Sequence, residues 1–456
     1  MKKKIMSLVL AGLLGISMAG CGLDEPAKSG DTAAAPAGEE QTSENEAAET
    51  AEGDTSKGPV TISFVSFING EDAGRRTLEK YLEIYEQETG NTVKESAGTA
   101  DETWKASIQA DFQSNAEPDV LYYFNGVDSD AFIKEGKVVS IEEIREAFPE
   151  YGSNMKEELL VPSPYDGVVY SIPHVGFWEA LFCNKNVLEA AGVEIPSLDD
   201  YTWDQFLDDC QKIKDAGYTP IALSVQQIPH YWFEYAQLNA SGPDKHMDIP
   251  VSIDDEAAGY WAQSLDDIKE LYDRGFFPDN TLTATDDEII QMMGTEEAAF
   301  CLDGSWRVTW FEDNADPNDF IAVFPPSKGN RKTTDYIGGI SSGLFITRKA
   351  WDDPAKREAC VKLVETLTCD EATFEWAVSG QVTALKNTVE PEGETHGLMD
   401  SIFAMNGRVT SISPAVQDSL EGNVRDNLFS NVKNVCTEKI TSKDAIQEML
   451  DMMNHN

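Results

Sequence analysis

The sequence predicts an α/β fold in which parallel-rich sheets, covered by helices, build two lobes. Segments with the alternating, β-branched pattern of strands take turns with amphipathic helical segments, an order typical of βαβ units. The chain has 456 residues, and the body that follows its N-terminal segments is long for a single hydrophobic core. These two observations favour two α/β lobes.

The first elements of the body follow one another closely. A strand is predicted at 60–67, where apolar and β-branched residues alternate. A helix is predicted over 75–89, because large apolar residues recur there at helical spacing and Gly90 follows. A strand at 92–95, a helix at 104–114 and a strand at 118–123 come next. This order predicts a parallel sheet with helices on both faces.

The N-terminus has the features of an export signal. Lys2, Lys3 and Lys4 precede an apolar stretch that is too short to span a bilayer comfortably. The stretch ends in Ser17-Met18-Ala19-Gly20-Cys21, which resembles the lipobox of bacterial lipoproteins. We therefore expect residues 1–20 to be a signal peptide, and Cys21 to be lipidated on the outer face of the cytoplasmic membrane. The alternative is an ordinary cleaved signal with a chance cysteine.

We expect residues 21–58 to form a disordered acidic linker. Leu23 is the one large aliphatic residue in this segment, which therefore cannot bury enough apolar surface to offset the entropy lost on ordering. The whole chain carries a formal net charge of −46, most of it in the body. Such a charge excludes nucleic acid and anionic membrane surfaces as partners. We expect a monomer that contacts the membrane through its lipid anchor alone.

Cysteine and histidine patterns give no sign of a metal or cofactor site. The six cysteines after Cys21 contain no CxxC pair, and buried free thiols are favoured over disulfides. The five histidines lack zinc-ligand spacing, and Walker A and HExxH motifs are absent from the sequence. We therefore expect no cofactor, no metal and no catalytic residues.

The order of short motifs resembles the family 1 extracellular solute-binding proteins, the group that contains the maltose-binding protein. The segments that carry this resemblance are Glu88-Thr89-Gly90, Pro118-Asp119, Gly136–Ile141, Asp166–Pro173, Phe182–Gly192, Tyr201–Phe206 and Glu297–Trp306. Each motif is weak alone, but they occur in the family's order over most of the body. The resemblance implies a type II periplasmic-binding-protein-like fold with the ligand in a cleft between two lobes.

The resemblance also implies where the chain passes between the lobes, near 174–180, 336–340 and 380–387. One lobe then comprises 59–175 with 338–382, and the other 180–336 with 384–456. The function implied is the binding component of an ABC importer, which captures a sugar or oligosaccharide by lobe closure and delivers it to permease subunits.

Asp303-Gly304-Ser305-Trp306 is the best candidate for a binding segment. Gly304 and Ser305 permit a tight turn at the end of an apolar strand, which aims the indole outward. Sugars have flat C–H faces and a rim of hydroxyls, so they need aromatic platforms beside hydrogen-bonding groups such as Asp303. The resemblance implies that Trp306 stacks on sugar; a core tryptophan is the alternative.

Glu179 lies at the first expected crossing, and Trp178 precedes it. This segment resembles the maltose-binding protein's crossing, whose glutamate accepts sugar hydroxyls, so Glu179 is expected to bind ligand and Trp178 to stack beside it. An exposed helical glutamate is the alternative.

Loops after three other expected strands complete the candidate site. They are expected to contribute Asn69, Glu71, Asp72, Phe124, Asn125, Gln227, His230, Tyr231 and Trp232. Turn and capping roles are the alternatives. Gln227 stands near the position of a carboxylate in the maltose-binding protein, which argues against maltodextrin as the ligand.

Two other functions compete with sugar capture. A polyamine binder suits an acidic body with aromatic loops, through cation–π contacts. Such a site needs several converging carboxylates, of which Glu179, Glu71 and Asp72 are the obvious candidates. A glycosidase needs a pair of catalytic carboxylates, and no motif identifies one.

Overall fold

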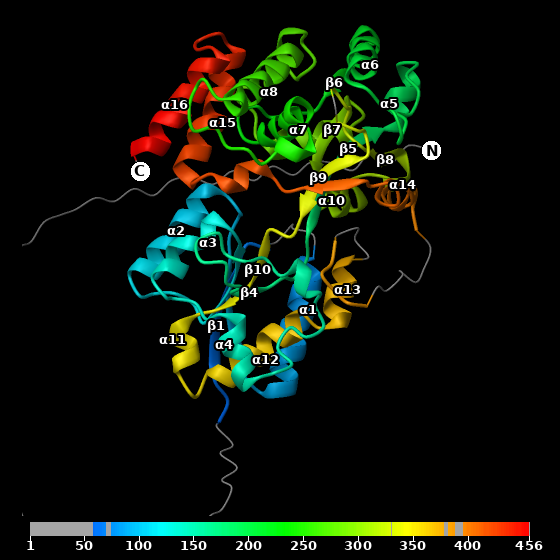
Figure 1. The fold of residues 1–456 in the computed structure, drawn as a ribbon. Coiled ribbons are helices and arrows are strands. Elements are labelled where there is room, and N and C mark those ends of the chain that lie inside the picture. The colour runs from blue at the N-terminus through cyan, green and yellow to red at the C-terminus, as the bar shows by residue number, and fades with distance from the viewer. Residues whose placement is uncertain (1–57, 70–73, 330, 378–381, 388–394, 456) are drawn as a thin grey trace, which may run out of the picture. The chain divides into compact units, whose positions relative to one another are not determined.

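Two β-sheets organise the chain, each with helices packed against it (Figure 1). The computed structural model describes residues 58–69, 74–329, 331–377, 382–387 and 395–455. The first sheet has the strand order β2-β1-β3-β10-β4, and the second has the order β11-β9-β5-β7-β6, with β8 paired to β5. We call each sheet together with the helices packed on it lobe 1 and lobe 2.

The sheet of lobe 1 is parallel at one side and antiparallel at the other. Its strands are β1 (Thr61–Ser66), β2 (Thr92–Ala97), β3 (Val120–Phe124), β4 (Ser171–Ile172) and β10 (Ser342–Ile346). β1 pairs in parallel with β2 and β3, and β10 runs antiparallel to β3 and β4. The predicted strands and their parallel pairing are confirmed.

Helices cover both faces of this sheet, as predicted. They are α1 (Arg75–Thr89), α2 (Glu102–Gln113), α3 (Val127–Lys134), α4 (Ile141–Ala147), α11 (Arg348–Asp352), α12 (Arg357–Leu367) and α13 (Asp370–Ala377). Alternation along β3 sends Val120 and Tyr122 into one core and Leu121 and Tyr123 into the other. α2 begins two residues before the predicted start, because Asp101 caps it by accepting from the Trp104 amide.

Lobe 2 is built on a mixed sheet. Its strands are β5 (Phe177–Asn184), β6 (Thr219–Ile221), β7 (Ala298–Gly304), β8 (Phe320–Val323), β9 (Asp335–Gly339) and β11 (Ser411–Ser413). β5 is antiparallel to β7, β8 and β9, whereas β6 and β11 pair in parallel with β7 and β9. Nearly every side chain of β5 and β7 is buried, as in a sheet covered on both faces.

The helices of lobe 2 share one large core with this sheet. They are α5 (Lys185–Ala190), α6 (Trp203–Asp215), α7 (His230–Ser241), α8 (Glu256–Asp273), α9 (Asp286–Gly294), α10 (Arg307–Asn314), α14 (Gly397–Asn406), α15 (Gly422–Cys436) and α16 (Ser442–His455). The short 3₁₀ helices η2 (Pro243–Lys245), η3 (Pro317–Asp319) and η4 (Val416–Ser419) lie in connections of this lobe, whereas η1 (Glu157–Leu159) lies in lobe 1 between α4 and β4.

The segments that connect the two sheets run side by side. Gly176, between β4 and β5, donates its amide to Val382 O at 2.7 Å, and Trp178 of β5 pairs with Gly338 of β9. A Cβ on Gly176 would lie 2.4 Å from Gly339 O, so this crossing requires glycine. The exact lobe boundaries drawn from the sequence stay a prediction.

In the described part of the chain, all six cysteines are free, and five of them are buried. The same residues include no group of three His, Cys, Asp or Glu side chains that could hold a metal ion. None of the described helices is both long enough and apolar enough to cross a membrane.

Candidate functional site

An aromatic group stands where β7 ends and α10 begins. Trp306 lies two residues after the end of β7 and is half-buried. Its ring centroid lies 6.1 Å from that of Phe177 and 5.8 Å from that of Tyr231. A Cβ on Gly304 would lie 2.2 Å from the Trp306 ring, so the indole folds back over a glycine that leaves room for it. The tight turn expected here brings three rings together.

Two buried glutamates lie beside this group. Glu179 on β5 and Glu234 on α7 are 1% and 0% exposed. The Tyr235 hydroxyl donates to the backbone oxygen of Glu179 at 2.8 Å, which fixes α7 against β5 at this point. Each carboxyl group affects the pKa of the other, and within the described part of the chain no protein donor reaches Glu179 Oε2 or either oxygen of Glu234.

Burial makes this carboxyl pair retain protons. It raises the pKa of Glu179 to about 8, and the negative charges of Asp303 and Asp418 act in the same direction. Burial also raises the pKa of Glu234 well above its usual value, assisted by the charge of Glu179. At neutral pH the pair therefore holds at least one proton and can both donate and accept hydrogen bonds.

Asp303 holds the turn that carries Trp306. This buried carboxylate accepts from the Gly304 amide at 2.7 Å and from Arg307 Nε at 2.6 Å. Arg307 also pairs with Asp286 at the start of α9. Asp303 therefore has a positioning role in this structure, and its predicted contact with ligand stays a prediction.

Trp178 and Trp232, both expected at the site, are core residues here. Trp178 packs on Phe182, because strand alternation directs residues 178 and 179 to opposite faces of β5. Trp232 stacks against Phe206 of α6, with ring centroids 5.5 Å apart. Neither indole presents a surface to a ligand in this arrangement, so their predicted role in binding has no geometric support.

His230 and Tyr231, at the start of α7, are half-buried and lie with their ring centroids 4.1 Å apart. Burial, assisted by the charges of Arg425 and Lys105, lowers the pKa of His230 to about 3. The imidazole is therefore neutral at pH 7 and offers one donor and one acceptor.

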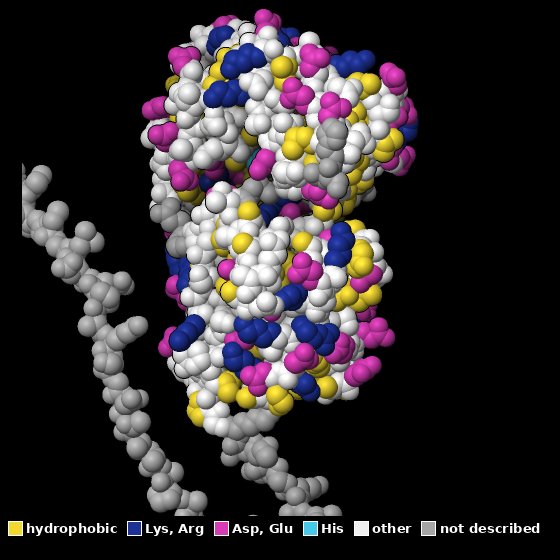
Figure 2. All heavy atoms as spheres, turned by 90° about the vertical axis from the view of Figure 1, so that its left-hand side faces the viewer, with side chains coloured by type: hydrophobic (Ala, Val, Ile, Leu, Met, Phe, Trp, Pro, Cys, Tyr) yellow, Lys and Arg dark blue, Asp and Glu magenta, His cyan; other side chains and the backbone are white. Residues whose placement is uncertain are grey.

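Charged side chains from both lobes meet near His230. Asp128 of α3 accepts from Lys105 Nζ at 2.8 Å and from Arg425 Nη2 of α15 at 3.0 Å. Figure 2 shows a recess in the face on view, in which basic and acidic side chains lie together. This network was not expected from the sequence.

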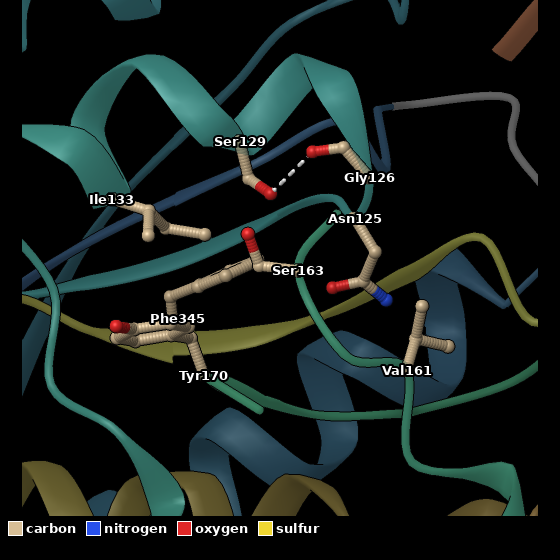
Figure 3. A pocket seen from close by; sticks show the side chains of 8 residues that line it. All are labelled: Asn125, Gly126, Ser129, Ile133, Val161, Ser163, Tyr170 and Phe345. Atoms are coloured by element: carbon tan, nitrogen blue, oxygen red, sulfur yellow. Dashed lines mark hydrogen bonds between the residues drawn. The ribbon is translucent and has the colours of Figure 1, made fainter. Parts of the chain in front are cut away.

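Two of the lobe 1 residues expected at the site, Phe124 and Asn125, lie at the end of β3. Phe124 stacks on Phe67 with ring centroids 4.8 Å apart, and Lys105 Nζ lies 4.4 Å above the Phe124 ring. Asn125 accepts from Ser171 Oγ at 2.7 Å, while its Nδ2 is buried with no partner among the residues that the structure describes. Asn125 also lines a small pocket (Figure 3), which has no room for a water molecule and is therefore not a ligand site.

The remaining candidates either contact neighbouring segments of the protein or lie outside the described residues. Asn69 donates to Thr99 Oγ1 at 3.1 Å. Gln227 is exposed and accepts from the Asp286 amide at 2.6 Å, so it supports the start of α9. Glu71, Asp72 and Cys21 lie outside the described residues. The predicted ligand contacts of these side chains stay predictions.

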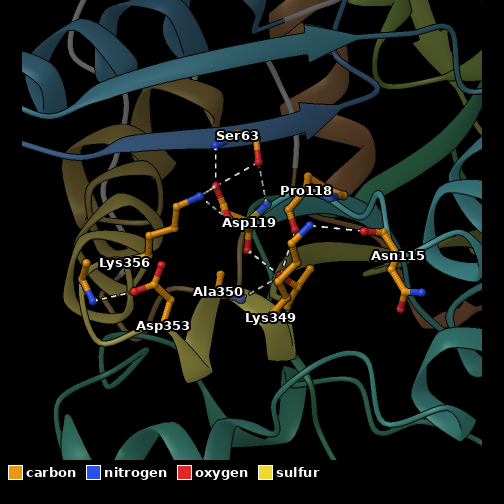
Figure 4. A network of polar contacts seen from close by, with 10 residues as sticks. Ser63, Asn115, Pro118, Asp119, Lys349, Ala350, Asp353 and Lys356 are labelled. Carbon is orange, nitrogen blue, oxygen red and sulfur yellow. Dashed lines mark hydrogen bonds and ion pairs between the residues drawn. The ribbon is translucent and has the colours of Figure 1, made fainter. Parts of the chain in front are cut away.

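A second buried carboxylate of lobe 1 serves the fold. Asp119 accepts from the amide and the hydroxyl of Ser63, at 2.8 and 2.9 Å, and pairs with Lys356 Nζ at 2.7 Å (Figure 4). Pro118 accepts from Thr347 Oγ1 at 2.8 Å. The Pro-Asp motif therefore ties β3 to β1, β10 and α12, away from the aromatic group of lobe 2.

These contacts define what the site can do chemically. The aromatic group offers flat apolar surfaces, and the carboxyl pair and the neutral imidazole offer hydrogen-bond donors and acceptors. Of the residues that carry this chemistry, Glu234 was missed from the sequence, because it is hidden in an apolar helical run. Such an arrangement fits a small polar molecule with both apolar faces and hydroxyl-type groups.

Comparison with known proteins assigns the chain to a family. The sequence matches the bacterial extracellular solute-binding proteins over residues 70–373, more than half of its length. The chain therefore belongs to this family, which confirms the resemblance seen in its motifs. No curated protein matches the sequence.

Solved structures share the fold. A protein described as a chitin oligosaccharide binding protein matches with a TM-score of 0.76 and 20% identity, over 87% of this chain and 98% of that one. The GacH receptor of Streptomyces glaucescens, solved unliganded and with acarbose, matches with a TM-score of 0.69 and 17% identity, over 87% of this chain and 98% of that one. A substrate-binding protein of Listeria monocytogenes in complex with cycloalternan matches with a TM-score of 0.68 and 14% identity, over 87% of this chain and 98% of that one. The predicted two-lobe α/β fold is confirmed.

Proposed function

We propose that this protein is the extracytoplasmic substrate-binding component of an ABC importer and that it captures a neutral sugar or oligosaccharide. The observation that carries the proposal is the aromatic group of Trp306, Tyr231 and Phe177 beside the proton-holding pair Glu179 and Glu234. Sugars offer apolar C–H faces to rings and hydroxyls to carboxyl groups. Structures of the same fold that are described with chitin oligosaccharide, acarbose and cycloalternan support this assignment.

The proposed mechanism is capture without catalysis. A ligand that touches both lobes binds the closed form better than the open form and shifts the population toward closure. A permease in the membrane then recognises the closed protein. Lipidation of Cys21 keeps the protein at the outer face of the cytoplasmic membrane, and the acidic segment up to residue 58 serves as its tether.

A ligand screen tests the proposal. Thermal melts with chito-, xylo-, galacto- and malto-oligosaccharides, their monosaccharides, and putrescine and spermidine should show stabilisation by one class of sugar, because a ligand of the folded state raises stability by mass action. Calorimetry then measures the affinity of the sugar that gives the largest shift. Stabilisation by polyamines with no response to any sugar would contradict the proposal.

Two variants test whether the ligand binds at the aromatic group. Tyr231→Ala should weaken binding, because it removes a ring that contacts Trp306. Trp310→Ala is the matched control, since Trp310 is also half-buried at α10 but packs on Phe311 and towards Gly294. Equal losses of affinity in the two variants would show that the aromatic group is not the binding surface.

One observation favours the polyamine alternative. Asp286, Asp303, Glu179 and Glu234 lie close together, which is more carboxylate than the sequence suggested. However, Arg307 pairs with both aspartates, and burial keeps a proton on the glutamates. Lys105 and Arg425 add positive charge near His230. These compensating charges favour a neutral ligand.

A further inference from the structure

A buried ion-pair network joins the two lobes. Lys105 on α2 and Asp128 on α3 belong to helices that pack on the sheet of lobe 1, whereas Arg425 lies on α15 of lobe 2. Asp128 Oδ2 lies 2.8 Å from Lys105 Nζ, and Asp128 Oδ1 lies 3.0 Å from Arg425 Nη2. Arg425 Nη1 is also 3.7 Å from Asp418 Oδ1 of η4. Asp128 and Arg425 are 297 residues apart in the sequence and lie in different lobes. This contact therefore exists only when the lobes meet.

Burial makes this contact energetically different from a surface ion pair. Lys105, Asp128 and Arg425 are 8%, 7% and 4% exposed. A buried charge that loses its partner is strongly unfavourable, because neither water nor another charge compensates it. Separation of the lobes must therefore either hydrate both sides of the network or leave Arg425 and Asp128 unpaired.

A second ion pair between the lobes offers a contrast. Arg76 on α1 and Asp313 on α10 lie 3.0 Å apart, but their side chains are 83% and 52% exposed. Water and salt screen such a pair, so it contributes little to holding the lobes together. The described residues therefore include a buried and an exposed ion pair between the lobes.

The buried network lies next to the candidate site. Lys105 sits over the ring of Phe124, and Phe429, one turn after Arg425 on α15, lies 5.6 Å from His230 between ring centroids. The contact between the lobes and the candidate binding surface therefore share neighbours on both sides.

We propose that the Lys105–Asp128–Arg425 network is a closure contact that holds the two lobes together before any ligand binds. The proposal rests on the proposed function in one respect, since closure matters because the protein captures its ligand between the lobes. The contact raises the closed fraction of the ligand-free protein. The apparent affinity for ligand then improves in proportion to that fraction.

Small-angle X-ray scattering of the ligand-free protein tests the proposal without any sugar. Residues 57–456 form a compact unit of their own and are the chain to use. The radius of gyration should stay small for the parent at both 50 and 500 mM salt, because a buried network is screened little. Arg425→Met should enlarge it, with at least a tenfold fall in the closed-to-open ratio, which corresponds to about 1.4 kcal/mol.

Further variants separate opening from unfolding. Asp128→Asn keeps the side chain's shape and removes its charge, so it should also open the protein while circular dichroism and the cooperative melt stay those of a folded chain. The double variant should be no more open than Arg425→Met alone, because the pair is already broken. Arg76→Met is the matched control and should leave the radius of gyration unchanged.

Two results would overturn the closure contact: a parent protein as expanded as Arg425→Met, or folded Arg425→Met and Asp128→Asn variants as compact as the parent. The proposed function fails separately. If the contrast between buried and exposed variants appears but no sugar binds the parent, the closure contact stands and the ligand assignment falls.

Discussion

Buried carboxylates are treated differently in the two lobes. Asp119 in lobe 1 receives two hydrogen bonds from Ser63 and an ion pair from Lys356, so its charge is fully compensated. Among the described residues, Glu179 and Glu234 in lobe 2 form no ion pair, three of their four oxygens lack a protein donor, and the charge of Arg425 only partly offsets the burial of Glu234. The lobe 1 carboxylate has its hydrogen-bonding capacity committed to the fold. The lobe 2 pair retains capacity for a proton or a ligand, which marks it as the functional side of the comparison.

The largest change in stability is expected from loss of Asp119, the carboxylate that is fully hydrogen-bonded within the fold. Asp119→Ala should lower the free energy of unfolding by about 3–5 kcal/mol, because it leaves Lys356 unpaired beside a largely buried site. Denaturant unfolding measures this loss. The sugar affinity of the folded fraction should be unchanged, since Asp119 lies away from the aromatic group. If the variant were as stable as the parent, Asp119 would not have the structural role that distinguishes it from the lobe 2 pair.

The carboxyl pair should make stability fall as pH rises. In the unfolded chain Glu179 releases its proton near pH 4.5, whereas in the folded protein its pKa is about 8, so the folded state binds more protons within this window. The stabilisation is complete below the lower value and is lost as pH approaches 8, with a slope of up to about 1.4 kcal/mol per pH unit for each proton retained.

The variant Glu234→Gln isolates this effect from other titrating groups. The amide can donate to Glu179, so the pair no longer needs a proton, and the difference in melting temperature between variant and parent should grow in the variant's favour from pH 5 to pH 8. Glu143→Gln is a suitable control, because its partly exposed pair with Arg348 lowers the pKa of Glu143 below the usual value, so its pH dependence lies below this range and the difference from the parent should stay constant from pH 5 to pH 8. Parallel pH profiles for the parent and Glu234→Gln would show that no proton is shared.

Trp306→Ala should weaken sugar binding by about 2 kcal/mol, roughly thirty-fold in Kd, the scale of a buried aromatic contact. The ligand-free variant should melt close to the parent, because the indole is half-buried and packs over Gly304 rather than in the core. Calorimetry and melts of the same preparations check both expectations. A severe loss of stability with intact affinity would make Trp306 a structural residue.

Much of the fold follows from the sequence because its signals are local. The spacing of Leu78, Tyr81 and Tyr85 predicted α1, and alternation predicted β1. The turn before Trp306 was also predictable, from Gly304 and Ser305. These features depend on residues within a few positions of one another, so no knowledge of the tertiary structure was needed.

The parts that could not be predicted depend on distant residues. Asp128 and Arg425 pair across 297 positions, and nothing in the periodicity of α15 indicates a partner in lobe 1. Glu234 lies in an apolar helical run, and its role appears only when α7 packs on β5. Trp178 was placed at the site because it adjoins Glu179, but strand alternation sends its side chain to the opposite face.

The smallest expected effect is the response of sugar affinity to salt, and it separates the two ligand classes most directly. A neutral sugar has no charge to screen, so its Kd should change less than twofold between 50 and 500 mM salt, whereas a polyamine should lose affinity steeply. The buried network should not alter this result, because Lys105, Asp128 and Arg425 are shielded from solvent ions. Calorimetric titrations at several salt concentrations measure the slope, with spermidine as the comparison ligand. A steep slope for the bound ligand would mean that the uncompensated glutamates of lobe 2 recognise positive charge, and the polyamine assignment would replace the sugar.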